Sequence, residues 1–268
     1  MNKHLLIQDI EKKLLGVSET AYLDAKFFVE GCEKQGLLIS DELIQDFIER
    51  RKRQEPVSKI IRSKGFWALD FYVTRDVLDP RPDSETLIEA VLEFFPDKNK
   101  SLDILDIGTG SGCLLVSLLY EYKNAVGTGV DISSKALEVA RKNAASYNAL
   151  FFEKDFYASD FQDGLQTYDV IVSNPPYIKT KEVQELEDAV RLYDPLKALD
   201  GGQDGLDAYR RLGIVLKPLL KKEGLVFFEI GQGQEEDVVL IMKKQGFNFL
   251  KSYKDLGKIE RILVFQSV

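Results

Sequence analysis

Histidine and cysteine are scarce in this sequence, and their scarcity removes several classes of chemistry. The only histidine is His4, and the two cysteines, Cys32 and Cys113, lie far apart without the spacing of metal ligands. A catalytic triad and a multi-histidine metal site both need histidine at the reacting centre, so both are excluded. We expect the two cysteines to be small buried hydrophobic residues in a reducing compartment, and we expect no bound metal.

Long apolar runs and an excess of basic residues are also absent. The chain has no 18-residue apolar stretch and no signal peptide, which predicts a soluble, cytoplasmic protein without a membrane partner. Its 36 basic and 44 acidic residues give a formal net charge of −8. A protein that grips bare duplex DNA needs a broad basic face, so we expect no stable nucleic-acid binding.

The first 63 residues have the pattern of a small helical domain. Apolar residues recur at helical spacing from Leu5 to Leu15, and Ser18 and Ser40 are placed to cap two further helices. Acidic and basic residues balance within this segment, so the whole negative excess lies downstream. We therefore predict a domain over residues 1–63.

Two other patterns follow the helical segment. Residues 64–79 are rich in strand formers and predict a β-hairpin that connects two domains. Residues 80–268 alternate strands and helices, which predicts an α/β catalytic domain with a parallel sheet wrapped by helices. The expected strands are 102–107, 125–130, 149–152, 168–173, 225–230, 247–253 and 259–265. The expected helices are 85–95, 113–120, one capped by Ser133 or Ser134 that runs to about 146, 181–190, 206–220 and 234–244.

A glycine-rich turn comes directly after the first strand of the α/β part. It consists of Gly108, Thr109, Gly110, Ser111 and Gly112. Three alternate glycines let the backbone turn tightly and approach a ligand closely. The spacing is not the GxGxxG of dinucleotide sites, and no GK[ST] follows, so a P-loop is excluded. Asp106, just before the turn, would repel a pyrophosphate but suits a ligand that carries an ammonium group.

The ends of the next two strands complete the pattern of a nucleoside site. Asp131 ends the second strand, where a carboxylate can accept from both ribose hydroxyls. After the third strand, Phe156 can stack on adenine while Asp155 accepts from its exocyclic amine; a core Phe beside a solvated Asp is the plainer alternative. A ligand with ribose, adenine, an amino group and no phosphate is S-adenosylmethionine, and we predict it as the cofactor.

The loop after the fourth strand carries Asn174, Pro175, Pro176 and Tyr177. Two prolines hold the chain extended, so the loop presents an amide side chain, a backbone carbonyl and an aromatic ring. The Asn174 oxygen and the Pro175 carbonyl can accept both N–H bonds of a planar NH2 group, while Tyr177 stacks on its face. These bonds orient a poorly nucleophilic nitrogen and push electron density onto it. A plain strand-ending turn uses the same residue types.

These motifs together resemble the HemK/PrmC family, the peptide chain release factor N5-glutamine methyltransferases. The resemblance runs from about Glu55 to the C-terminus. It is carried by EPVSKII, FWALDFYVTRDVLDPRPDSETLIE, LDIGTGSG, VDIS, VSNPPYI, ALDGGQDGL and FFEIGQGQ. NPPY alone is shared with adenine-N6 and other amino methyltransferases, whereas its combination with RPDSE, the glycine turn and ALDGG is specific. The chain departs from the family at Asp79, where many members carry Ile.

The resemblance implies a Rossmann-like S-adenosylmethionine-dependent methyltransferase domain with a small N-terminal helical domain. The methyl acceptor it implies is the glutamine side-chain amide in the GGQ motif of class I peptide chain release factors. By the family pattern, residues 108–112 cradle the amino-acid end of the cofactor, Asp131 holds ribose and Phe156 lies over adenine. The helical domain is implied to help dock the release factor.

The same family pattern assigns the substrate side of the site. Asn174 and the Pro175 carbonyl would hold the glutamine amide, with Pro176 stiffening the loop and Tyr177 beside the amide. Three other functions fit part of the pattern. They are methylation of a glutamine in a ribosomal protein, adenine-N6 methylation of nucleic acid after base flipping, and a cofactor-binding adaptor without activity.

Overall fold

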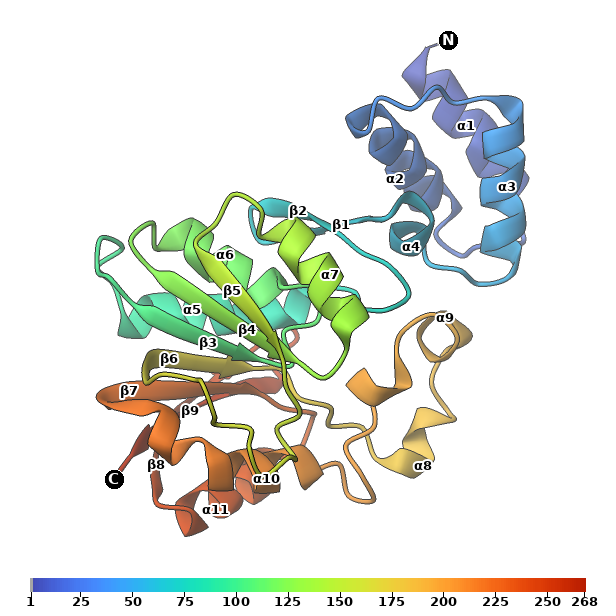
Figure 1. Ribbon diagram of the computed structural model, residues 1–268. Helices are drawn as coiled ribbons and strands as arrows, with labels where there is room; N and C mark the ends of the chain where they lie inside the picture. The colour runs from blue at the N-terminus through green and yellow to red at the C-terminus, as the bar shows by residue number, and fades with distance from the viewer. Residues whose placement is uncertain (1) are drawn as a thin grey trace.

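The computed structural model describes residues 2–268, which form a helical bundle and a larger α/β part (Figure 1). The bundle consists of α1 (Lys3–Leu14), α2 (Ala21–Lys34), α3 (Asp41–Lys52) and α4 (Val57–Ile61). Its core draws only on residues between Leu6 and Ile61, and the rings of Phe28 and Phe47 stack at its centre with centroids 4.1 Å apart. None of the helices in the described range is long and apolar enough to cross a membrane.

A side-chain cap explains where α3 begins, whereas α2 begins without one. Ser40 precedes α3 and accepts a hydrogen bond from the Leu43 amide at 3.2 Å, which confirms its predicted role. The prediction that Ser18 caps the second helix is wrong. Its hydroxyl accepts instead from the Thr20 amide in the preceding turn, and Thr20 occupies the N-cap of α2 without a side-chain bond.

A short antiparallel hairpin, β1 (Ser63–Phe66) and β2 (Leu69–Tyr72), leads out of the bundle. It is shorter than the expected 64–79, because residues 73–81 continue as a loop without strand partners among the described residues. Phe66 and Phe71 pack into the core of the α/β part. The hairpin therefore belongs to the α/β core by packing, although it follows the bundle directly in the chain.

The α/β part is a seven-stranded sheet with the order β5-β4-β3-β6-β7-β9-β8. Strands β3 to β7 run parallel to one another, and the terminal hairpin β8–β9 adds antiparallel to β7. The strands are β3 (Asp103–Ile107), β4 (Val126–Asp131), β5 (Ala149–Glu153), β6 (Tyr168–Ser173), β7 (Leu220–Glu229), β8 (Phe247–Lys254) and β9 (Glu260–Ser267). The helices are α5 (Glu85–Phe94), α6 (Cys113–Glu121), α7 (Ser134–Asn143), α8 (Thr180–Val183), α9 (Asp188–Arg191), α10 (Asp207–Val215) and α11 (Glu235–Lys244).

Neighbouring residues of the central strands enter different cores, because side chains alternate between the faces of a sheet. Ile104 on β3 and Phe227 on β7 pack in the core beneath α5, α6 and α7. Leu105 and Phe228 pack in the core beneath α10 and α11 on the other face (Figure 1). Burial on both faces explains why these strands are continuous apolar runs in the sequence.

Three elements differ from the expected ones. The helix expected at 181–190 is two short helices, α8 and α9, separated by a turn. The helix expected at 206–220 ends at Val215, and a 3₁₀ turn, Lys217–Leu219, follows it. Strand β7 starts at Leu220, earlier than the expected 225. This start was missed because the three residues after Leu220 are charged and do not show the apolar pattern of a buried strand.

Candidate active site

A cavity of about 420 Å³ lies at the carboxyl ends of the parallel strands. The strand order reverses between the neighbouring strands β3 and β6. Open α/β sheets bind ligands at such a switch point. Its walls come from the loops after β3, β4, β5 and β6, from residues 76–81, and from residues 195–200. Of the sequence-predicted site residues, Gly108, Thr109, Gly110, Ser111, Asp131, Asp155, Phe156, Asn174 and Pro176 line it.

The glycine turn has a backbone that other residues adopt only with strain. Gly108 and Gly112 have φ angles of 72° and 78°, in the left-handed region. A Cβ at Gly108 would meet nothing within 4 Å, so the missing side chain leaves open space beside the cavity. A Cβ at Gly112 would lie 3.3 Å from the Ala140 Cβ, so glycine there also permits close packing on α7.

Asp106 lies beneath this turn and does not line the cavity directly. Its Oδ2 accepts from the Thr109 hydroxyl at 2.6 Å, while its buried Oδ1 has no hydrogen-bond partner among residues 2–268. Burial, with Asp131 nearby, raises the pKa of Asp106 to about 7 against the opposing Thr109 bond. A buried carboxylate oxygen without a partner fits the cationic ammonium group expected from the sequence.

Asp131 is tied to the backbone around the turn. Its Oδ2 accepts from the Gly110 amide and its Oδ1 from the Ser133 amide, each at 2.9 Å. Burial raises its pKa, and these amide bonds oppose the rise. The carboxylate is thereby fixed at the cavity wall with lone pairs left for hydroxyl donors.

The loop after β5 forms the opposite wall. Phe156 is partly buried against the core beneath α10 and α11, and it also borders the cavity. Asp155 Oδ1 accepts from the Tyr157 amide at 2.8 Å. Cys113, expected to be buried, is in fact only partly buried and borders the cavity. Burial raises the pKa of its thiol to about 12, so it stays protonated at neutral pH.

Some residues of the loop after β6 line the cavity, and others do not. Asn174 borders the cavity, and its side-chain Nδ2 donates to the Ser84 hydroxyl at 3.3 Å. Pro175 and Tyr177 are not among the lining residues. The Tyr177 hydroxyl donates to Glu229 Oε1 at 3.3 Å, and stacking of its ring on a bound amide stays a prediction.

Sequence reasoning missed Ser84 and Glu229, which lie behind Asn174. Ser84 precedes α5 and donates to Glu229 Oε2, while Glu229 ends β7 and is 1% exposed. Burial raises the pKa of Glu229 to about 7, although its bonds from Ser84 and Tyr177 and the charge of Arg261 oppose the rise. The available signal was a lone acidic residue at the end of the apolar run GLVFF.

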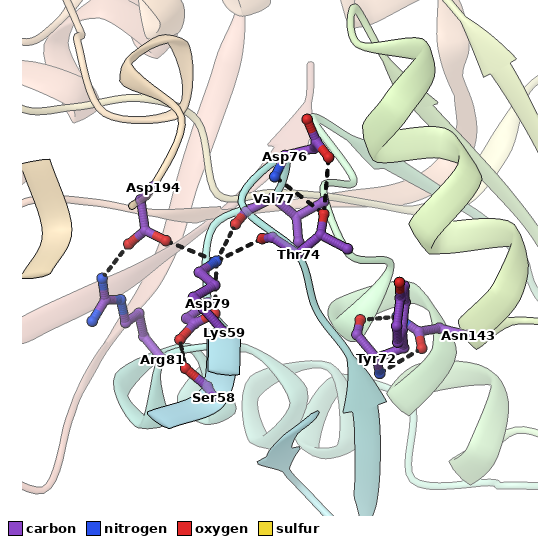
Figure 2. Close-up of polar contacts among 10 residues, drawn as sticks. All are labelled: Ser58, Lys59, Tyr72, Thr74, Asp76, Val77, Asp79, Arg81, Asn143 and Asp194. Atoms are coloured by element: carbon purple, nitrogen blue, oxygen red, sulfur yellow. Dashed lines mark hydrogen bonds and ion pairs between the residues drawn. The ribbon is translucent and has the colours of Figure 1, made fainter. Parts of the chain in front are cut away.

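A residue of the helical bundle binds the segment 76–81, which forms one wall of the cavity (Figure 2). Lys59 of α4 has a fully buried side chain that pairs with Asp79 at 2.8 Å and Asp194 at 3.0 Å. It also donates to the Thr74 and Val77 carbonyls at 2.9 and 2.6 Å. The bundle therefore supplies the cation around which this wall is arranged.

Asn143 fastens the hairpin to the glycine turn. Its side chain exchanges two hydrogen bonds with the Tyr72 backbone, at 2.8 and 2.9 Å (Figure 2). The same amide group donates to the Ser111 carbonyl at 2.8 Å. Neither Lys59 nor Asn143 was singled out from the sequence, because each acts through contacts far along the chain.

Comparison with known proteins finds related methyltransferases. The Methyltransferase small domain family matches residues 82–192. A release factor glutamine methyltransferase of Caulobacter vibrioides is 42% identical over 82% of this chain and 76% of its own length. One from Clostridium acetobutylicum is 37% identical over 82% of this chain and 78% of its own. A solved methyltransferase of Pyrococcus furiosus shares the fold, with a TM-score of 0.53 and 20% identity over 76% of this chain and 92% of its own.

This protein is a Rossmann-like methyltransferase with an N-terminal helical region. The class is defined by the sheet order and by the glycine turn and the NPPY loop, which meet at one cavity. The identities with relatives that this chain covers over most of their length go further. The chain belongs to the family of release factor glutamine methyltransferases.

Proposed function

We propose that this enzyme transfers a methyl group from S-adenosylmethionine to the side-chain amide nitrogen of the glutamine in the GGQ motif of class I peptide chain release factors. The observation that carries the proposal is the position of Asn174, which shares one cavity with the glycine turn. The cofactor half and the amide-binding half of the site are therefore contiguous. The related enzymes are release factor glutamine methyltransferases, which gives the release factor as the substrate class.

The chain offers suitable partners for each part of the cofactor. The unpartnered Asp106 oxygen suits the ammonium group, and the open space at Gly108 suits the amino-acid end. Asp131 is fixed where it can accept from ribose hydroxyls, and Phe156 presents a ring to adenine, with Asp155 for the exocyclic amine. When bound, S-adenosylmethionine supplies an electrophilic methyl group, and S-adenosylhomocysteine is the product.

The residues of the NPPY loop act on the amide. The Asn174 oxygen and the Pro175 carbonyl accept its two N–H bonds, which orients the nitrogen lone pair and increases its electron density. The loop is stiff because two prolines fix its backbone, so the acceptors need little reorganisation. A dedicated base is unnecessary, because the amide nitrogen becomes strongly acidic once it is alkylated and loses its proton to water.

Replacement of Asn174 by Ala tests this assignment. We expect turnover to fall by at least about 100-fold, since an acceptor aimed at the reacting nitrogen is removed. Cofactor affinity, measured by calorimetry, should stay within a few-fold of wild type. The exposed variant Asn99→Ala serves as the control. Equal losses of turnover and of cofactor affinity would make Asn174 a structural residue instead.

A second experiment separates the possible substrates. Labelled S-adenosylmethionine is offered with a release factor, with ribosomal protein or with DNA, in separate reactions. We expect label on the release factor, and mass spectrometry should place it on the GGQ glutamine. The NPPY loop also suits a ribosomal glutamine or a flipped adenine. Preferential labelling of ribosomal protein or DNA would therefore overturn the substrate proposal but not the methyltransferase chemistry.

A further inference from the structure

A buried chain of hydrogen bonds lies behind Asn174 and joins three separate elements. Asn174, after β6, donates through Nδ2 to the Ser84 hydroxyl, at the start of α5, at 3.3 Å. Ser84 donates to Glu229 Oε2 at the end of β7. The Tyr177 hydroxyl donates to the other oxygen, Oε1, at 3.3 Å. Ser84 is 3% and Glu229 1% exposed, so water does not compete for the bond between them.

The directions of these bonds follow from the number of protons available. An ionised carboxylate only accepts hydrogen bonds, so the single hydroxyl proton of Ser84 goes to Glu229. The Ser84 oxygen is then left as an acceptor, and the Asn174 group that faces it has to be the NH2 donor. The Asn174 side-chain oxygen is consequently free to accept a hydrogen bond from a group in the cavity.

We infer that Ser84 and Glu229 are positioning residues that hold the Asn174 amide with its oxygen, rather than its NH2 group, available to the methyl acceptor. The inference rests on the proposed function, which needs an acceptor at that atom. With the amide reversed, Asn174 would present donors to a substrate NH2 group, and two donors repel each other. The chain of bonds thus selects the productive one of two nearly isosteric orientations.

Ser84 and Glu229 do not have the contacts of ordinary structural residues. Ser84 ends the 3₁₀ turn Pro82–Ser84 that leads directly into α5, and its side chain makes no cap bond to the helix. Glu229 sits at the end of an apolar strand, where an ionised carboxylate is costly to bury. Both features are explained by the chain of bonds that runs from Glu229 through Ser84 to Asn174.

Protonation of Glu229 changes the directions of these hydrogen bonds. Its pKa is raised to about 7, with Ser84, Tyr177 and Arg261 opposing the effect of burial and Asp83 adding to it. The Cys113 thiol and the Tyr209 hydroxyl also interact with its charge, and burial raises the pKa of both, so both stay protonated at neutral pH. A protonated Glu229 can donate to Ser84, and the Ser84 hydroxyl can then turn its proton toward Asn174. The fraction of amide in the productive orientation should therefore fall as the pH drops through about 7.

Kinetics at saturating cofactor and release factor test the inference. We expect Ser84→Ala to lower kcat by about 10- to 100-fold with little change in cofactor affinity, since misorientation of a reacting contact has effects of this size. Ser84→Thr keeps the hydroxyl and should restore most of kcat. In wild type kcat should fall below about pH 7, and in Glu229→Gln, which cannot ionise, this fall should disappear. The exposed Glu93→Gln makes the same chemical change as a control and should keep the wild-type pH profile.

A readout without substrate separates this inference from the proposed function. In protein labelled with ¹⁵N-asparagine, the Asn174 side-chain NH2 signal is assigned by its loss in Asn174→Ala. We expect this signal to shift with pH, with a midpoint near 7, in wild type and not in Glu229→Gln. Thermal unfolding midpoints of all variants confirm that each is folded. A Ser84→Ala variant with unchanged kcat, or an Asn174 signal that titrates identically in Glu229→Gln, would overturn the inference. Failure of the wild type to methylate a release factor would overturn only the proposed function.

Discussion

Asp106 and Glu229 are buried carboxyl groups whose pKa values are both raised to about 7, but they face different halves of the site. Asp106 lies beneath the glycine turn with one unpartnered oxygen, whereas both oxygens of Glu229 accept hydroxyl bonds behind Asn174. A group that binds the cofactor changes its affinity, while a group that orients the methyl acceptor changes turnover. The two titrations near neutral pH should therefore appear in different kinetic quantities.

At the residue scale, Asp106 predicts a pH-dependent cofactor affinity. Below about pH 7 the free protein holds Asp106 protonated, and a cationic ammonium favours the ionised form, so binding releases a proton. We expect affinity to rise as the pH increases toward about 7, by at most about tenfold per pH unit, and then to level off. Calorimetry in buffers of different ionisation enthalpy measures both the affinity and the proton.

The variant Asp106→Asn cannot ionise and serves as the matched comparison. It should bind the cofactor more weakly above pH 7 and should show no proton release. Affinity that is independent of pH in wild type would mean that the ammonium group binds elsewhere. The depth of Asp106 was not predictable from the sequence, which placed it in the site by its position before the turn.

At the element scale, Ser133 and Ser134 were equally good candidates to cap α7 from the sequence. In the structure Ser133 is the N-cap, and its hydroxyl accepts from the Ala136 amide at 3.2 Å. We expect Ser133→Ala to lower the free energy of unfolding by about 1 kcal/mol. Ser134→Ala, at an exposed helical position, should change it by less than about 0.5 kcal/mol. Urea denaturation of the two variants measures the difference, and similar losses would contradict the assignment.

Regular elements were predictable where one local pattern dominates. The central strands were found because burial on both faces leaves apolar runs such as Tyr168–Ser173, and turns were found from glycine. The polar start of β7 and the break between α8 and α9 were missed because neither has a strong periodicity. Ser18 was misassigned because serine satisfies turns and caps by the same kind of bond.

The site residues likewise fall into those that a local sequence pattern predicts and those that it does not. Residues at strand ends or just after them, such as Asp131 and Asn174, were found because the carboxyl ends of parallel strands meet at one edge. Ser84, Glu229 and Asn143 were missed because their roles come from packing between distant segments. Asp79 was visible only as a departure from the family pattern, and its pairing with Lys59 requires the helical bundle to be in place.

At the scale of the whole molecule, two lysines connect the helical bundle to the rest of the chain in contrasting settings. Lys59 is buried between Asp79 and Asp194, and Arg81 also pairs with Asp194 at 2.9 Å (Figure 2). Lys34 pairs with Asp70 of the hairpin at 2.6 Å, with side chains 63% and 50% exposed. Removal of a buried cation leaves its carboxylates uncompensated, whereas water replaces an exposed partner. The same substitution at the two positions therefore compares the stability that a buried ion pair and an exposed ion pair contribute.

We expect Lys59→Met to lower the free energy of unfolding by about 3–5 kcal/mol and Lys34→Met by no more than about 1 kcal/mol. Lys59→Met should also weaken cofactor binding, because the carbonyls and carboxylate that it holds belong to the loop that walls the cavity. Urea denaturation and calorimetry with S-adenosylmethionine measure the two effects. Addition of Asp79→Asn to Lys59→Met removes one uncompensated charge and should recover part of the lost stability. If Lys59→Met lost stability but bound the cofactor normally, the bundle would stabilise the enzyme without shaping its cofactor site.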